Sequence, residues 1–309
     1  MARVLLTFFF ATLFCFTSAT PSHKLLGRAS VKTLSSSTIH SYKPYAFYSS
    51  AAYCSPSNIK KWNCGANCKA NPHFLPNITG GDGSTTRYWY VGYDPTLNTV
   101  IVSHEGASPG AMLSSLDAAD SALTPLDQAY FGGISTDIKV HKNLANEHLR
   151  SAYDLFYAVA NLLVQYIDER PSVTLVGHSR GAALSLLDAV MFTNSFPPLT
   201  KIKYVGYGLP RVGNQAFADY VDKYITSIDE GAGFVRINNK KDPVPINPSR
   251  ALGFVHPSGE IHIQASGAWV SCPGQDNSAS QCIRGTVQND ASGTKQDSYG
   301  PYDGVTMGC

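Results

Sequence analysis

The chain has 309 residues and a formal net charge of +2, and charged residues make up only 15% of it, against a usual fraction of about 25%. This length allows one or two domains with a large buried core. No block of basic residues is present, so we expect no nucleic acid as a partner. Such a sparsely charged chain is compatible with uncharged substrates.

The N-terminus has the pattern of a secretory signal peptide. Arg3 precedes an apolar run of about 13 residues, Val4–Phe16, and Thr17-Ser18-Ala19 supplies the small residues of a cleavage site. The run is too short to span a bilayer, and no other stretch is long enough to form a transmembrane segment; a membrane anchor is the alternative. We expect residues 1–19 to be removed and the mature protein to be soluble, secreted and monomeric. Asn77 begins a glycosylation sequon that a secreted chain can use.

Polar, serine-rich residues without periodicity follow from 20 to 44, which predicts a loosely held leader or pro-segment. Residues 45–309 contain no repeat and no linker, so we expect a single domain. Its first part, Tyr45–Lys69, mixes aromatic residues, small residues and cysteines, which suggests a first helix held by disulfides.

Seven cysteines become six when Cys15 leaves with the signal peptide, and an even number in an oxidising compartment predicts three disulfides with 15 possible connectivities. Two pairs are close in sequence and leave one long-range pair, so the natural pairing is Cys64 with Cys68, Cys272 with Cys282, and Cys54 with Cys309. No histidine lies at ligand spacing from these cysteines, so we expect neither a metal nor another cofactor.

Periodicity predicts the next elements. Two β-rich runs, Arg87–Tyr93 and Thr99–Val102, flank a turn-forming segment and indicate a hairpin. The long, partly apolar connection between Ala107 and Val140 suits a lid, and a packed irregular connection is the alternative. From Ala145 to Ile167, apolar residues at helical spacing, Tyr153 among them, predict one long amphipathic helix.

The stretch Val173–Leu187, VTLVGHSRGAALSLL, is the most informative. A buried strand runs into Ser179 and a helix follows it, with Gly177 and Gly181 on either side of the serine. A hydroxyl at such a turn stands clear of its own backbone, and the helix N-terminus favours developing negative charge. A Cβ at either glycine would crowd the turn. We interpret this stretch as a nucleophile elbow.

Ile202–Tyr207 and Phe234–Asn238 are further strands, with a helix predicted over Gly213–Tyr224 between them. Strands that alternate with helices predict an α/β fold, in which a mostly parallel sheet is covered on both faces. Asp242 follows the second of these strands. Because open α/β sheets place their chemistry at the carboxyl ends of strands, we expect Asp242 to be the acid that orients a catalytic base.

The base itself is difficult to find. In α/β-hydrolases the catalytic serine, acid and histidine follow one another in that order along the chain, but here no histidine follows His262. His178 adjoins the serine and points away from it. His256 and His262 follow Asp242 closely, and both are more readily explained as structural. If a substitute base is recruited, His256 or a neighbouring group is the candidate. The oxyanion hole would use the amides of Arg180 and Ala107.

Five motifs resemble the fungal class 3 lipases, secreted α/β-hydrolases that include triacylglycerol lipases and feruloyl esterases. The resemblance covers residues 45–309 and rests on VTLVGHSRGAALSLLDAV, YVGYGLPRVGNQAFADYV, RINNKKDPVPINP, GFVHPSGEIHI and GPYDGVTMGC. It implies an α/β-hydrolase fold, an acyl-enzyme mechanism without a metal, and ester substrates with long acyl chains. In such a family Ser179 matches the nucleophile, Asp242 the acid, and Ala107 and Arg180 the oxyanion donors. The lid would open at a lipid–water interface.

This chain departs from the family pattern at four positions around the site. Ser298 stands where the family carries its triad histidine, just before Gly-Pro-Tyr. Arg180 replaces the usual leucine after the nucleophile, and Ala107 a serine or threonine. Where the family tends to show His-x-Gly-Phe, this chain has His141-Lys142-Asn143-Leu144. We therefore expect a lipase-like serine ester hydrolase with impaired catalysis, or a non-catalytic homologue, a pseudoenzyme, that binds an apolar ligand or a lipid surface.

Overall fold

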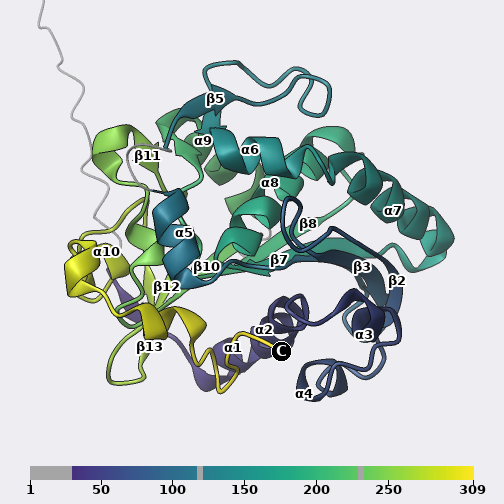
Figure 1. Cartoon of the computed structure of the whole chain (residues 1–309), viewed down its shortest axis with the longest axis horizontal. Helices are drawn as coiled ribbons and strands as arrows, with labels where there is room; N and C mark the ends of the chain where they lie inside the picture. Colours follow the sequence, from purple (N-terminus) through teal and green to yellow (C-terminus); the bar gives the residue numbers. More distant parts are fainter. Residues whose placement is uncertain (1–29, 117–120, 229–232) are drawn as a thin grey trace, which may run out of the picture.

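The computed structural model of the chain describes residues 30–116, 121–228 and 233–309. The expected signal peptide, residues 1–19, lies outside the described residues. Within them, a central sheet of nine strands has the order β1-β13-β12-β10-β8-β7-β4-β3-β2 (Figure 1). The bounds of these strands are β1 (Lys32–Thr33), β2 (Leu75–Gly80), β3 (Trp89–Asp94), β4 (Thr99–His104), β7 (Ser172–His178), β8 (Ile202–Tyr207), β10 (Phe234–Asn239), β12 (Glu260–Ile263) and β13 (Trp269–Cys272).

The middle of the sheet is parallel, and its two edges are antiparallel. Strands β4, β7, β8, β10 and β12 run in the same direction, whereas β2, β3, β13 and β1 pair antiparallel with their neighbours. The hairpin β3–β4 lies where the turn chemistry predicts it. A mixed, largely parallel sheet confirms the predicted α/β class.

Helices cover both faces of the sheet, as Figure 1 shows. The upper layer in that view contains α6 (Lys142–His148), α7 (Ala152–Gln165), α8 (Arg180–Ser195) and α9 (Gln215–Val221). The lower layer contains α1 (Ser36–Ser41), α2 (Lys43–Ala51), α3 (Pro56–Lys60) and α4 (Ala66–Lys69). Along β4, Val100 and Val102 belong to the core under α7 and α8, and Ile101 belongs to the core over α2. Because both faces are buried, the central strands read as nearly continuous apolar runs.

Shorter elements complete the described part of the chain. A small antiparallel sheet has the order β11-β9-β6-β5. Its strands are β5 (Leu123–Pro125), β6 (Lys139–His141), β9 (Gly213–Asn214) and β11 (Phe254–Val255). The remaining helices are α5 (Pro109–Ser115) and α10 (Ile283–Thr286), the 3₁₀ helices η1 (Ile167–Glu169), η4 (Val244–Ile246), η5 (Arg250–Leu252), η6 (Asp290–Ser292) and η7 (Lys295–Tyr299), and the π-helix η2 (Asp222–Thr226).

The segment 20–44 differs from the sequence-based expectation in its described part, residues 30–44. Instead of a loosely held leader, these residues form β1 and α1 and begin α2. Lys32 and Thr33 pair antiparallel with Ser271 and Val270 of β13. A strand that bonds to a sheet edge needs no apolar periodicity of its own, so composition gave no sign of it.

The helix predicted from Ala145 to Ile167 is two helices, α6 and α7, which a turn at 149–151 separates. At the end of α6, the buried His148 turns its Nε2 to the Asp188 carboxylate of α8 at 2.9 Å, and His104 donates to the other oxygen of Asp188 at 2.6 Å. Helical spacing also misplaced Tyr153, which is 59% exposed. The helix direction changes at the turn, so one periodicity cannot describe both faces.

Three disulfides join the cysteines as their spacing suggests. Cys64 pairs with Cys68, Cys272 with Cys282, and Cys54 with Cys309, the last across 255 residues. The long-range bond fixes the C-terminus beside α2. None of the helices in the described part of the chain has the length and apolar character that a membrane crossing requires.

Candidate active site

Ser179 stands at the sharp turn between β7 and α8. Its φ of +55° is unfavourable for a residue with a side chain, and its amide donates to the Tyr207 carbonyl of β8 at 2.8 Å. A Cβ on Gly177 would lie 2.5 Å from the Gly181 carbonyl carbon, and one on Gly181 would lie 2.2 Å from the His104 carbonyl oxygen. Strand, strained turn and helix therefore have the geometry of a nucleophile elbow, and both glycines are needed for it.

Asp242 lies in the loop after β10 and is fully buried. One carboxylate oxygen accepts a hydrogen bond from the Val244 amide at 2.9 Å. Burial raises the pKa of Asp242 to about 7, and the contacts with Val244 and Ser298 only partly oppose this shift. Close to neutral pH the carboxyl group is therefore divided between its neutral and ionised forms.

Ser298, in η7, is also fully buried, and its hydroxyl lies against the Asp242 carboxyl group. The alignment is poor: neither Ser298 Oγ nor Asp242 Oδ2 makes a well-formed hydrogen bond with a described residue. The structure thus brings together an acid and a hydroxyl from positions 56 residues apart in sequence. An alcohol cannot act as a general base near neutral pH, because its proton affinity is too low.

His178 is engaged below the elbow. Its Nε2 lies 2.8 Å from the Ser298 carbonyl oxygen and its Nδ1 lies 2.6 Å from the Tyr53 hydroxyl. A carbonyl only accepts, so Nε2 carries the proton and the tyrosine hydroxyl donates to Nδ1. Burial lowers the pKa of His178 to about 4, so the ring is neutral at pH 7. The imidazole beside the serine therefore positions the η7 backbone.

The two histidines after Asp242 have other partners. His256 is buried, donates from Nε2 to the Pro245 carbonyl at 2.7 Å, and has a pKa that burial lowers well below the ordinary value. Its main-chain amide donates to the Asp276 carboxylate. His262 places its two ring nitrogens 2.7 and 2.8 Å from backbone carbonyls. These contacts favour structural roles for both residues.

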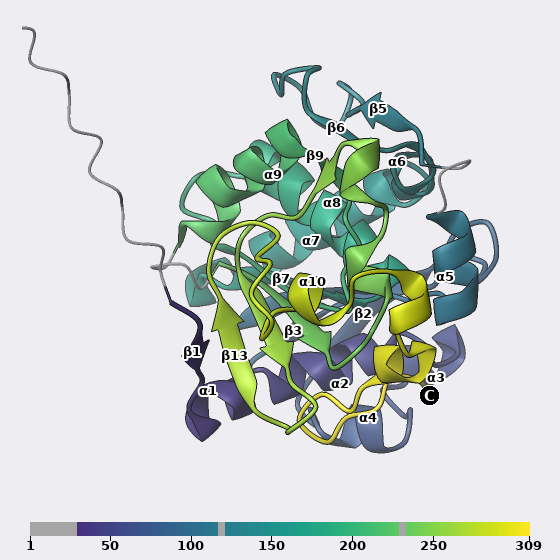
Figure 2. The same cartoon turned by 90° about the vertical axis from the view of Figure 1, so that its left-hand side faces the viewer.

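Helix α5 covers the site. Met112 and Leu116 form an apolar cluster with Ala107 and Val244. Ala107 lies in the loop after β4, and Val244 is the second residue after Asp242. The helix also packs against η7, and Figure 2 shows it beside the C-terminal segment. Ser179 is completely buried under this cover, and its hydroxyl has no hydrogen-bond partner among the described residues. In this conformation the serine is closed to solvent.

The Arg180 side chain turns away from the serine. Nε and Nη2 both lie 2.5 Å from one oxygen of Glu147 in α6, and Nη1 lies 3.4 Å from the Ser115 hydroxyl at the end of α5. The other oxygen of Glu147 accepts from the Arg87 amide at 3.2 Å. The long cation after Ser179 thus joins α8 to α6 and to the covering helix, and it does not enter the apolar cluster.

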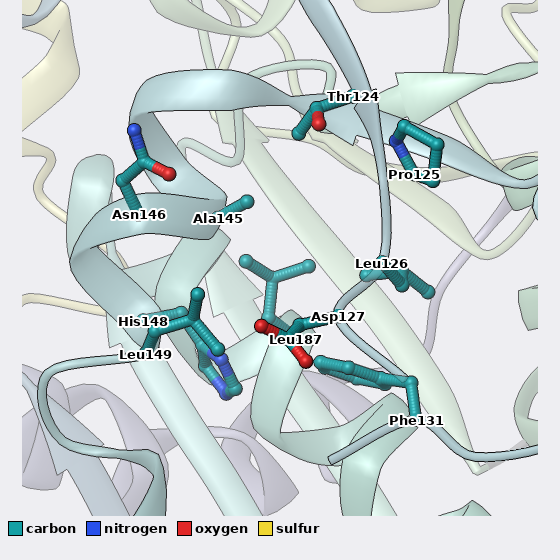
Figure 3. Close-up of a pocket in the computed structure, with 10 residues that line it drawn as sticks. All are labelled: Thr124, Pro125, Leu126, Asp127, Phe131, Ala145, Asn146, His148, Leu149 and Leu187. Atoms are coloured by element: carbon teal, nitrogen blue, oxygen red, sulfur yellow. The ribbon is translucent and has the colours of Figure 1, made fainter. Parts of the chain in front are cut away.

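A separate hollow of about 170 Å³ lies between α6 and the segment that follows β5 (Figure 3). Leu126, Phe131 and Leu187 form much of its wall, with His148 at one side. Its lining includes none of the sequence-predicted site residues. His148, at its side, already forms a hydrogen bond with Asp188. This hollow is therefore not part of the candidate active site.

Sequence reasoning missed three residues that hold the site together: Tyr53, Glu147 and Tyr302. The Tyr302 hydroxyl donates to the Ser298 carbonyl at 3.1 Å, so that carbonyl receives two hydrogen bonds. Tyr53 and Glu147 are far in sequence from their partners, so no local pattern points to them. Tyr302 lies only four residues after Ser298, within the motif GPYDGVTMGC, but the motif alone does not indicate this contact.

A strained strand–serine–helix turn and an acid after a later strand, both at the carboxyl edge of a mixed sheet, define an α/β-hydrolase. The model of the family Lipase (class 3) matches residues 84–251, more than half of the chain. The chain therefore belongs to the class 3 lipase family.

Relatives and solved structures agree with this assignment. The secreted mono- and diacylglycerol lipase 3 of Gibberella zeae is 31% identical over 233 residues, which cover 74% of this chain and 69% of the relative. The secreted mono- and diacylglycerol lipase LIP2 of Malassezia restricta is 32% identical over 180 residues, but the match spans only 55% of its length. The Lip2 lipase structure from Yarrowia lipolytica has a TM-score of 0.77 at 22% identity, over 91% of this chain and 98% of that one.

The triacylglyceride lipase structure from Rhizomucor miehei is similar to the same degree. It has a TM-score of 0.74 at 23% identity and covers 90% of this chain and 98% of its own. At such identities these two structures support the fold, and the roles of individual site residues remain predictions.

Proposed function

We propose that the protein is a secreted ester hydrolase of the class 3 lipase family in which the catalytic triad is impaired. In this proposal Ser179 is the nucleophile, Asp242 is the acid, and the amides of Ala107 and Arg180 stabilise the oxyanion. The observation that carries it is the environment of Asp242: the hydroxyl of Ser298, and no imidazole of the described residues, lies against its carboxyl group.

The mechanism would be acyl transfer through a serine ester. The Ser179 oxygen attacks the ester carbonyl, the carbon–oxygen bond to the alcohol breaks, and water then releases the acid. The two backbone amides can stabilise the charge on the carbonyl oxygen in both steps. Among the described residues no side chain is placed to take the proton of the serine, because neither Ser298 nor the engaged His178 can do so. In this step water therefore has to carry the proton to the departing alcohol. Removal of a triad member costs on the order of 10⁶ in rate, and roughly 10³–10⁴ over water survives.

Acylglycerols are the substrates that we propose. The mono- and diacylglycerol lipases of the relatives support this choice, as does the apolar cluster that α5 places above the serine. When α5 moves away from Ala107, the long acyl chain of an ester would take the place of Met112 in the apolar cluster. The secreted relatives likewise support an extracellular location.

A second candidate function is lipid binding without catalysis. Two observations favour it: the Ser179 hydroxyl has no partner among the described residues, and the pKa of Asp242 is raised to about 7, which leaves the acid only partly ionised at neutral pH. A protein that had lost its base could keep the apolar site for binding alone.

Hydrolysis of p-nitrophenyl butyrate and of a diacylglycerol emulsion, with Ser179→Ala as the matched variant, tests the proposal. We expect turnover at least 1,000-fold below that of an ordinary lipase, on the order set by loss of the base, together with an acyl group on Ser179 that mass spectrometry detects and that Ser179→Ala lacks. Absence of the acyl-enzyme from both proteins would leave the binding function. Turnover as fast as ordinary lipases that Ser179→Ala abolishes would contradict the impairment.

A further inference from the structure

A polar hollow of about 340 Å³ adjoins the candidate active site at the N-terminal end of α8. It is unlike the apolar cluster under α5, because its lining is almost entirely polar and carries three arginines and one carboxylate. The residues that line it are Ser84, Thr85, Arg87, Ser115, Asn143, Asn146, Glu147, Arg150 and Arg180. Formal charge on the lining is therefore +2, since three cations face a single anion.

The one carboxylate of the lining is already neutralised. Glu147 is bound by the Arg180 guanidinium and by the Arg87 amide, and only 5% of its side chain is exposed. The positive charge that remains is that of Arg87 and Arg150. Within the described residues neither forms an ion pair: Arg87 donates to the Gly83 carbonyl and Arg150 to the Thr85 carbonyl.

The Arg87 guanidinium is the more constrained of the two. Its Nε is buried and has no hydrogen-bond partner among the described residues. Glu105 lies close enough for Arg87 to lower its pKa, although burial has the larger, opposite effect. The Glu105 carboxylate accepts from the Tyr88 amide and is not part of the lining. Even when Glu105 is counted, three arginines face two carboxylates, so the charge of the hollow stays positive.

The position of the hollow links it to the serine. Arg180 follows Ser179 directly, and Ser115 ends the helix that covers the site. The neutral amides of Asn143 and Asn146, on α6, add donors beside the two arginines. The hollow therefore shares Arg180 and Ser115 with the surroundings of Ser179.

We propose that this hollow binds the phosphate group of a phosphoglyceride, so that the lipid bound at Ser179 carries a charged headgroup. Guanidinium forks match phosphate oxygens in geometry and charge. A neutral acylglycerol would leave both arginines without an anion. A fatty-acid carboxylate fits less well, because its acyl chain would follow it into a polar hollow. The proposal rests on a lipid site at Ser179 and narrows the lipid from an acylglycerol to a phosphoglyceride.

Calorimetric titration of the mature protein with soluble short-chain probes tests this assignment. The probes are dihexanoyl phosphatidic acid, dihexanoylglycerol and glycerol 3-phosphate, each below its aggregation concentration. The variants are Arg87→Gln and Arg150→Gln, which remove the charge and keep a polar side chain. The control is Arg250→Gln, because Arg250 is 45% exposed and lies outside the hollow.

We expect the phosphatidate to bind at least tenfold more tightly than either other probe. Each hollow variant should weaken it about tenfold, as the loss of a charge-assisted contact does, with no change in Arg250→Gln. Phosphatidate and dihexanoylglycerol that bind equally, with no effect of the variants, would overturn the phosphate site and leave the lipid site intact. Glycerol 3-phosphate that binds as tightly as phosphatidate would assign the hollow to a free phosphate ester. Binding of no probe would refute the lipid site itself.

Discussion

Replacement of Ser298 by histidine should restore catalysis. The Ser298 side chain is fully buried against the Asp242 carboxyl group, whose Oδ2 has no hydrogen-bond partner among the described residues. An imidazole that started from this position could donate to Oδ2 and present its second nitrogen toward the elbow. The hydrogen bond would also favour the ionised form of Asp242, which burial alone disfavours.

The size of the gain follows from two opposing terms. A triad member is worth on the order of 10⁶ in rate, whereas a misplacement of about 1 Å costs about 10². The site around Ser298 is filled, so the larger ring should cost about 1–3 kcal/mol of stability and shift from its best position. Even two such misplacements leave a gain of at least about 100-fold.

The assay is kcat/KM for p-nitrophenyl butyrate in Ser298→His, with Ser298→Asn as a polar control that lacks a basic nitrogen. Thermal unfolding followed by circular dichroism establishes that each variant is folded. The double variant with Ser179→Ala should return to background. A folded Ser298→His protein with an unchanged rate would refute the reasoning, as would a gain that survives loss of Ser179.

The remaining predictions concern stability. Because the pKa of Asp242 is raised to about 7 in the folded protein, the unfolded chain ionises first as the pH rises from about 4, and stability falls up to pH 7. Asp242→Asn should therefore raise the free energy of unfolding by on the order of 4 kcal/mol at pH 7.5 and have little effect at pH 3.5, measured by urea titration. Although burial opposes ionisation of Asp188, two imidazoles lower its pKa to about 2, so its contribution is present above pH 4 and is lost as the pH falls through 2. Asp188→Ala should cost about 3–5 kcal/mol at pH 7, and a loss below 1 kcal/mol would contradict the buried network. Replacing Cys54 and Cys309 by serine should cost about 2–5 kcal/mol in non-reducing urea titrations, with the Cys64–Cys68 pair as the control for a short loop.

The sequence predicts the elements that have strong local patterns. The strand before Ser179, the helix after it and the strand at Ile202–Tyr207 all lie where periodicity and turn chemistry put them. The break between α6 and α7 was not predictable from local sequence. It lies directly after His148, whose hydrogen bond is to the carboxylate of Asp188, 40 residues away. Nor was β1, whose partners come from β13.

The candidate site shows the same division. The position of Ser179 and the contact between Asp242 and Ser298 follow from motifs and from the family resemblance. The surroundings of Arg180 could not be derived, because the pairing with Glu147 and the polar hollow depend on how α6 packs against α8. The sequence shows that Arg180 is unusual at this position, but only the packing shows which residues it contacts.

Strand β1 has a consequence for the handling of this protein. Its two residues cover part of the outer edge of β13, which would otherwise present unpaired amides and carbonyls beside Trp269. A chain trimmed to residue 45 would expose that edge, and an exposed edge strand is a template on which a second copy can pair. Preparations that lack residues 30–44 should therefore aggregate, even though every residue near Ser179 is retained.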